Sequence, residues 1–332
     1  MNKKLALLLS VFLLSALPAA AQTEPPAFSF VQQMLLGFSG REVAVGIRLD
    51  SAGDASQPVT AQLRDEQGQV LGQLSLFEGK GQKVLLHIKP GWTGAKYLSV
   101  WRNGQKLSSD LLLVCDNLAS KELRRVDNGH QQLAITFSAS FNDYYVLEFL
   151  DLLNQYQAKA TFFLSAEFAF RNPDTVREVL SRGHQLGSHS FSHLDLTKED
   201  NLKIHSEIVR SLDMLEKVSG TRPQVFKPPF SYYNERIRAI SRALGCEAVK
   251  WSLDSMDWNP EYPAWRIAAR TLKKAQAGDI VQFHFGAKTL EAMQTILPAW
   301  QEAGYELVTL DTMLSPGPYQ VDEEGRAHFP KP

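Results

Sequence analysis

The spacing of hydrophobic residues divides the chain into two regions with different periods. From about residue 28 to 116, apolar positions alternate with polar ones, as in the run "VAVGIRL" at 43–49. A period of two is that of a strand with one buried face. The sequence "RNGQ" at 102–105 is typical of a hairpin, because Asn-Gly tolerates the positive φ angles of a tight turn. The pattern predicts a small all-β sandwich of immunoglobulin or fibronectin type over 28–116.

From 130 to 314, short apolar runs alternate with segments of helical period. The run "LAITFS" at 133–138 precedes a helical pattern at 144–156, and this alternation then repeats along the chain. The apolar runs lack polar alternation, as in strands that are covered on both faces. Repeated βα units predict an α/β fold with a parallel sheet, either a (β/α) barrel or a doubly wound sheet. The proline-containing segment 315–332 is predicted to be an extended, loosely held tail.

The first 21 residues have the pattern of a secretory signal peptide. Lys3 and Lys4 precede an apolar run at 5–17, and the small residues at 19–21 form an A-x-A cleavage site. The apolar run is shorter than the roughly 20 residues that a spanning helix needs. We therefore expect cleavage near Ala21 and an exported protein, periplasmic or secreted, without stable membrane insertion.

Composition narrows the classes of partner. The chain has 332 residues, 44% of them hydrophobic, and a formal net charge of -1. Without a basic stripe or a large net charge, nucleic acid is not an expected partner. In an exported protein, Cys115 and Cys246 could form a disulfide, and the alternative is two buried free thiols.

Polar residues follow five of the strands predicted in the second region. In a βα barrel, the loops that leave the carboxyl ends of the strands meet on one rim, where the chemistry takes place. These residues are Ser138 to Asp143, His189 and His193, Lys227, Asp254 and Asp257, and His284. Two histidines four residues apart suggest metal ligation, but a catalytic zinc usually takes three protein ligands, so they form half a site.

Three of these loops carry motifs by which the region 130–314 resembles the polysaccharide deacetylase family (carbohydrate esterase family four). "GHQLGSHSFSH" contains the H-[S/T]-x-x-H pair of metal ligands, "SLDSMDW" resembles the D-x-x-D-W motif, and "GDIVQFHF" resembles the last strand, which ends in a catalytic histidine. The resemblance implies a distorted (β/α) barrel that removes N- or O-acetyl groups from polysaccharides. It also implies a divalent metal, with zinc as the expected ion, held by His189 and His193.

The resemblance also implies roles for other residues. His284 would be the general acid that protonates the leaving amine, Asp257 would orient it, and Trp258 would form an apolar wall around the acetyl group. Other candidates for contact with the sugar are Phe141, Tyr232, Tyr233 and Lys227.

The first and third motifs depart from the family pattern. The family reads T-F-D-D-G, with a general base followed by the third metal ligand, whereas Ser138 and Ala139 stand at the two aspartate positions here. Lys227 replaces the arginine that holds the base. Asp143 is the nearest carboxylate on the first loop and is the candidate third ligand. The alternative is a two-histidine site completed by water.

Two functions follow from this altered motif set. The first is metal-assisted deacetylation of an envelope or extracellular glycan, such as peptidoglycan, a chitin-like oligomer or an exopolysaccharide. Loss of a general base typically costs about 10²–10⁴ in rate, so activity would be low. The second is a catalytically inactive relative that binds glycan or acts as an envelope assembly partner. A nucleophilic Ser138 would require an adjacent base, and the sequence identifies none.

Overall fold

The structure is a computed structural model of the chain, and it divides into two compact units, Met1–Leu118 and Ala119–Pro332. The described residues are 28–30, 34–38, 42–49, 59–65, 67–76, 82–90, 94–102, 104–115, 121–141 and 144–330. The signal peptide expected over 1–21 lies outside them. Within these ranges, no helix is long and apolar enough to cross a membrane.

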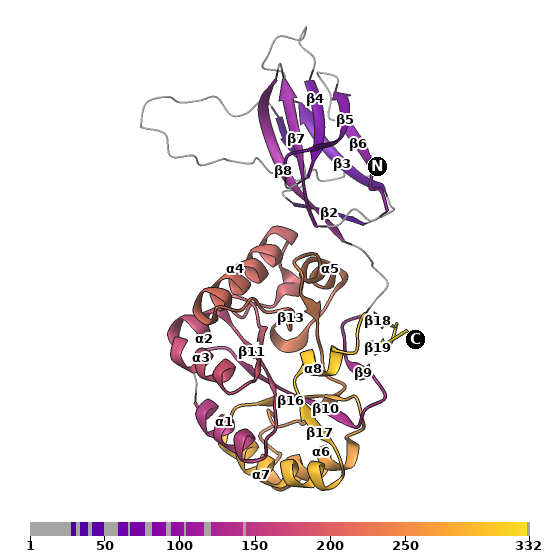
Figure 1. The fold of residues 1–332 in the computed structure, drawn as a ribbon. Coiled ribbons are helices and arrows are strands. Elements are labelled where there is room, and N and C mark those ends of the chain that lie inside the picture. The colour runs from indigo at the N-terminus through magenta and orange to yellow at the C-terminus, as the bar shows by residue number, and fades with distance from the viewer. Residues whose placement is uncertain are drawn as a thin grey trace, which may run out of the picture. The chain divides into compact units, whose positions relative to one another are not determined.

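The first unit contains only strands in its described part, and they form two sheets (Figure 1). One sheet has the order β1-β3-β6, formed by Phe28–Phe30, Glu42–Leu49 and Gln82–His87. The other has the order β2-β8-β7-β4-β5, formed by Met34–Phe38, Gln105–Cys115, Gly94–Arg102, Val59–Arg64 and Val70–Leu76. The predicted hairpin is confirmed, since Arg102 pairs with Gln105 and Gly104 has a φ of 75°. Val45 of β3 shares an apolar core with Val100 of β7, so the two sheets pack together. The immunoglobulin or fibronectin type stays a prediction.

The second unit is built on eight strands that all pair in parallel, as its sequence pattern predicts. Their order is β14-β13-β12-β11-β10-β16-β15, and β17 pairs with the start of β10. Their bounds are Gln132–Ala139 (β10), Thr161–Leu164 (β11), Gln185–Ser188 (β12), Val225–Phe226 (β13), Glu247–Ala248 (β14), Leu253–Asp254 (β15), Ile280–His284 (β16) and Glu306–Val308 (β17).

The sheet is a curled, parallel half-barrel, and it refines the distorted (β/α) barrel that the family resemblance implies. In the described part of the chain its order ends on β14 and β15. Only residues 249–252 separate these two strands, whereas parallel neighbours need a crossover of about a dozen residues or more. β14 and β15 therefore cannot pair with each other, and the sheet stays open between them.

Helices cover the sheet and bury its apolar strands. They are α1 (Val146–Gln155), α2 (Ala166–Arg171), α3 (Pro173–Ser181), α4 (Asn201–Ser219), α5 (Glu235–Ala243), α6 (Ala264–Lys274), α7 (Ala287–Glu302) and α8 (Leu310–Leu314). The helix boundaries follow local chemistry: Asp200 caps α4 by accepting from Lys203 N at 2.8 Å, and Gly220 ends it with a φ of 76°. Phe137 of β10 lies at the centre of the core, against Phe149 of α1 and Phe283 of β16.

The C-terminal segment is folded, which corrects the expectation of a loosely held tail. Residues Gln320–Val321 (β18) and Arg326–His328 (β19) form a hairpin, and β19 pairs in parallel with β9 (Arg125–Asp127). Ala327 is fully buried beside β9. Burial of apolar side chains in this small sheet outweighs the effect of the prolines around it.

Cys246 follows the alternative without a disulfide. Cys246 is a buried free thiol whose Sγ donates to the Pro223 carbonyl at 3.2 Å. Burial raises the pKa of this thiol to about 12, so it is inert near neutral pH. The side chain of Cys115 lies outside the described residues.

Candidate active site

The carboxyl ends of the parallel strands border a pocket of about 520 Å³. Its lining residues are Ser138, Ser140, His189, His193, Phe230, Ser231, Tyr232, Trp251, Asp254, Trp258, Gln282 and His284. Residues that were singled out on separate loops of the sequence therefore lie around one cavity. Their convergence follows from the parallel sheet, because every strand delivers its following loop to the same edge.

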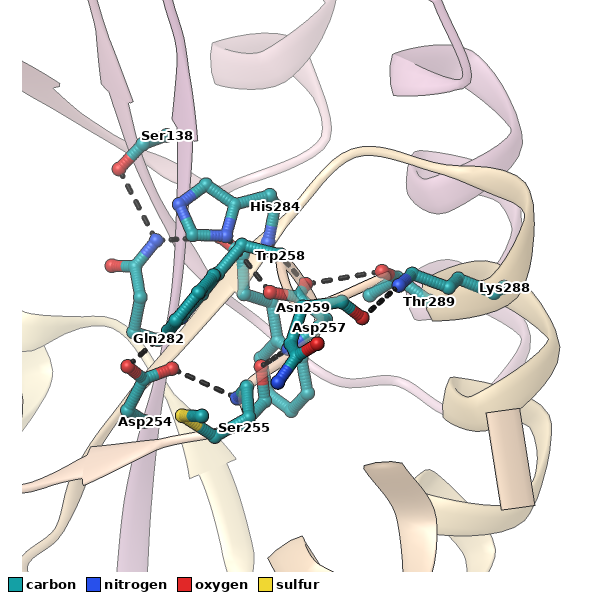
Figure 2. Close-up of polar contacts among 12 residues, drawn as sticks. Ser138, Asp254, Ser255, Asp257, Trp258, Asn259, Gln282, His284, Lys288 and Thr289 are labelled. Carbon is teal, nitrogen blue, oxygen red and sulfur yellow. Dashed lines mark hydrogen bonds and ion pairs between the residues drawn. The ribbon is translucent and has the colours of Figure 1, made fainter. Parts of the chain in front are cut away.

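His284 and Asp257 form a hydrogen-bonded pair at this pocket (Figure 2). His284 Nδ1 lies 2.8 Å from Asp257 Oδ1, and the backbone N–H of His284 donates to Asp257 Oδ2 at 2.6 Å. Thr289 Oγ1 at the start of α7 donates to the same Oδ2 at 3.0 Å. Asp257 is only 3% exposed, whereas the His284 side chain is 43% exposed. The carboxylate is thus fixed behind the imidazole, and the imidazole faces the pocket.

Asp254 has a different task from Asp257. Its Oδ1 accepts from Met256 N at 2.8 Å, and its Oδ2 accepts from Trp258 Nε1 at 3.1 Å. It therefore holds the loop after β15 and positions the indole, which is 57% exposed at the rim. Trp258 is a wall of the pocket and does not belong to the core.

A polar chain occupies the place where the family has an arginine and an aspartate. Lys227 is 2% exposed and donates to Gln282 Oε1, and Gln282 Nε2 donates to Ser138 Oγ at 3.3 Å. The Lys227 amine also lies 4.3 Å from the centre of the Phe163 ring. Burial lowers the pKa of Lys227 well below its usual range, although Asp254 and Asp257 partly oppose this effect. Gln282 thus connects the two altered family positions.

His189 and His193 are the residues best suited to hold a metal. His189 is 4% exposed and its Nδ1 lies 2.6 Å from the Lys227 carbonyl, which leaves Nε2 directed away from that bond. The centroids of the two imidazole rings are 5.2 Å apart. Burial lowers the pKa of both rings, strongly so for His189, where Lys227 adds to the effect. Both imidazoles are neutral near pH 7, the form that ligates metals.

The donor set nevertheless falls short of a catalytic metal site. No group of three or more His, Cys, Asp or Glu residues that could hold a metal occurs among the described residues. Asp143, the predicted third ligand, lies outside them. The described residues supply two of the three protein ligands that a catalytic zinc takes, so they do not fit such a centre by themselves.

Aromatic side chains surround His193 at the mouth of the pocket. Phe230 packs edge-on against its ring at 4.9 Å and Phe141 at 5.8 Å, and Tyr232 lies 5.7 Å from Phe230. Phe141, Phe230 and Tyr232 are each about half exposed, at 47%, 54% and 55%. Exposed aromatic faces of this kind can stack on the apolar faces of sugar rings.

The backbone around the pocket is strained. Positive φ angles occur at Ser190 (68°), His193 (58°), Phe230 (58°), Ser231 (53°) and Met256 (64°), all on loops that border or support it. Such conformations cost on the order of 1–3 kcal/mol each and persist where the surroundings enforce them, commonly at functional sites.

The structure changes or adds to the sequence-based set at several positions. Tyr233 does not face the pocket: its hydroxyl donates to the Val249 carbonyl at 2.6 Å, so it holds β13 and β14 together and is not a stacking residue. Gln282 was missed, although it precedes His284 by two residues on one strand and thus shares its face. Phe230 was also missed, because its exposure depends on a left-handed turn that the sequence does not reveal.

Comparison with known proteins gives consistent matches to one family. The profile described as polysaccharide deacetylase matches residues 125–249. A peptidoglycan-N-acetylglucosamine deacetylase from Bacillus cereus is 35% identical over 196 residues, which cover 57% of this chain and 91% of that protein.

Solved structures show the same fold. A mutant of peptidoglycan deacetylase PdaC from Bacillus subtilis is 28% identical with a TM-score of 0.53, over 57% of this chain and 92% of that one. BA3943, a pseudoenzyme of carbohydrate esterase family four from Bacillus anthracis, has a TM-score of 0.57 at 21% identity, over 59% of this chain and 69% of that one.

Proposed function

Because this chain belongs to the polysaccharide deacetylase family, we propose that its second unit hydrolyses acetyl groups on a cell-envelope polysaccharide of the peptidoglycan type. The similar Bacillus cereus protein is a peptidoglycan-N-acetylglucosamine deacetylase, which supports this class of substrate. The signal-peptide pattern of residues 1–21 supports export, which would bring the protein to such a glycan.

The observation that carries the proposal is the His284–Asp257 pair at the aromatic-rimmed pocket. Acetyl hydrolysis requires a group that transfers a proton at the leaving sugar atom, and an imidazole oriented by a buried carboxylate is suited to that step. Trp258 and Tyr232 would hold the sugar, and the mouth of the pocket beside His193 would admit the glycan chain.

The family uses a divalent metal, but the described residues of this chain do not complete such a site. We therefore assign only proton transfer and glycan binding to named side chains. Without the usual base at position 138, the expected rate is about 10²–10⁴ below that of a complete site.

The test is the release of acetyl groups from purified peptidoglycan by the mature protein, followed by mass spectrometry of the digested glycan. Wild type should produce sugars that lack one acetyl group, and His284→Ala should not. Equal products from both proteins, or none from wild type after prolonged incubation, would contradict the proposal.

A second function is favoured by one specific observation. Ser138 and Ala139 supply neither of the carboxylates of the family motif. A site that keeps the aromatic rim without those carboxylates would bind glycan without hydrolysing it. Co-sedimentation with insoluble peptidoglycan that is lost in Trp258→Ala, with no acetyl release, would support this binding function instead.

A further inference from the structure

The residue at the first altered family position has a base beside it. Ser138 of β10 and His284 of β16 are register partners on adjacent parallel strands, and both line the pocket. Paired strands lie about 4.8 Å apart, so the two side chains are immediate neighbours on one face of the sheet. Figure 2 shows the imidazole of His284 between Asp257 on one side and Ser138 on the other.

The hydrogen bonds fix which nitrogen of His284 can act. Asp257 is a carboxylate and only accepts, so the Nδ1 atom that faces it carries the ring proton. In the neutral imidazole, Nε2 then carries the lone pair. Asp257 is itself held by Thr289, so this tautomer is built into the structure. Nε2 is the atom that could take a proton from a hydroxyl in the pocket.

The polar chain through Gln282 prepares Ser138 for such a transfer. The Phe283 carbonyl accepts from the Gln282 amide at 2.6 Å, which identifies the atom there as Nε2. The same Nε2 donates to Ser138 Oγ at 3.3 Å, and Lys227 donates to the amide oxygen. Because Ser138 Oγ accepts one bond, its own proton is free for a base, and the N–H would stabilise negative charge that develops on the oxygen.

We propose that Ser138, His284 and Asp257 form a nucleophilic triad that transfers acetyl groups without a metal, with O-acetyl esters of glycans as the substrate class. This inference rests on the proposed function, since it assumes that the pocket admits an acetylated sugar. Ser138 and His284, both described in the structure, are not hydrogen-bonded to each other. Catalytic pairs often tighten only when substrate binds.

The reaction balances with water as the only co-reactant. His284 Nε2 takes the Ser138 proton as Oγ bonds to the acetyl carbon, the bond from that carbon to the sugar oxygen breaks, and the proton passes to the sugar oxygen. Water then attacks acetyl-Ser138 while His284 takes one of its protons. The Oγ–acetyl bond breaks, the proton returns to Oγ, and acetic acid leaves and releases its proton to solvent. An ester is the expected substrate because a sugar alcohol leaves more readily than an amine.

The test is covalent labelling of the full chain with an alkyl fluorophosphonate, which bonds to nucleophilic serines. Intact mass and peptide mapping would follow the adduct in wild type and in three variants: Ser138→Ala, His284→Gln and the surface control Ser181→Ala. We expect one adduct on Ser138, no labelling of Ser138→Ala, a rate about 100-fold lower in His284→Gln, and an unchanged rate in Ser181→Ala. A metal chelator should leave the wild-type rate unaltered.

Three results would overturn the inference: no adduct on wild type, an adduct on Ser140, or equal labelling of wild type and His284→Gln. Thermal unfolding of each variant would show that it is folded. The two claims can fail separately. Acetyl release from peptidoglycan without any Ser138 adduct would refute the triad and leave the proposed function standing. A Ser138 adduct without action on any acetylated glycan would support a nucleophilic Ser138 but would refute both the proposed function and the glycan ester as its substrate.

Discussion

Replacing Asp257 by Asn tests how the structure orients His284. The carboxylate accepts three hydrogen bonds, two from His284 and one from Thr289. If the amide oxygen keeps the bonds to the His284 backbone and Thr289, the amide NH₂ faces Nδ1. An NH₂ group can only donate, so the imidazole must place its proton on Nε2. The ring then offers no lone pair to the pocket.

The magnitudes follow from these contacts. Hydrogen bonds to charged groups contribute about 1.5–3 kcal/mol and neutral ones about 0.5–1.5, so weakening three bonds costs about 3 kcal/mol of folding free energy. The wrong tautomer should lower the rate of acetyl release by about 10²–10⁴. Initial rates of acetate release and thermal unfolding would measure the two effects.

Asp279→Asn is the matched control for this experiment. Asp279 is also 3% exposed and accepts from Ser252 Oγ and Gln276 N at 2.7 Å each, but it does not line the pocket. It should lose comparable stability and keep the wild-type rate. An unchanged rate in Asp257→Asn, or an equal fall in both variants, would refute the orienting role of Asp257.

Three further predictions concern stability and metal binding. Gly187→Ala would place a Cβ 2.5 Å from Phe163 Cδ1, so we expect a loss of about 1–3 kcal/mol in urea unfolding, and an unchanged midpoint would contradict the packing. Burial lowers the pKa of His184 from 6.5 to about 4. The free energy of unfolding should therefore be highest above about pH 6.5 and should fall by about 3 kcal/mol as the pH drops toward 4. His184→Gln should flatten the dependence of this free energy on pH between 6.5 and 4. The double change Ser138→Asp with Ala139→Asp would supply the carboxylates that are missing beside the two pocket histidines. Calorimetry should then show a zinc affinity at least about 10-fold higher than that of wild type. Equal affinities would argue against a latent metal site.

The sequence predicts the parts of the fold that depend on local pattern. Period-two alternation and the Asn-Gly turn identify the strands of the first unit, and the βα alternation identifies the parallel sheet. The polar residues at strand ends converge because parallel strands share an edge. Those relations need no knowledge of which strand lies beside which.

Features that depend on pairing between distant segments could not be predicted in this way. The contact from Lys227 through Gln282 to Ser138 joins three strands and appears only once β10, β13 and β16 are placed. That His284 lies beside Ser138 was missed for the same reason, since 146 positions separate the two residues in the sequence. Tyr233 was misplaced because the left-handed turn at Phe230 changes the direction of the chain just before it.

The most direct test of the central claim is acetate release from an acetylated peptidoglycan fragment by wild type and His284→Ala, each with and without a metal chelator. The account predicts slow release by wild type that the chelator does not abolish, and none above background by His284→Ala. Release that persists in His284→Ala would contradict a site whose chemistry rests on the His284–Asp257 pair. Release that disappears entirely with the chelator would contradict the metal-free triad.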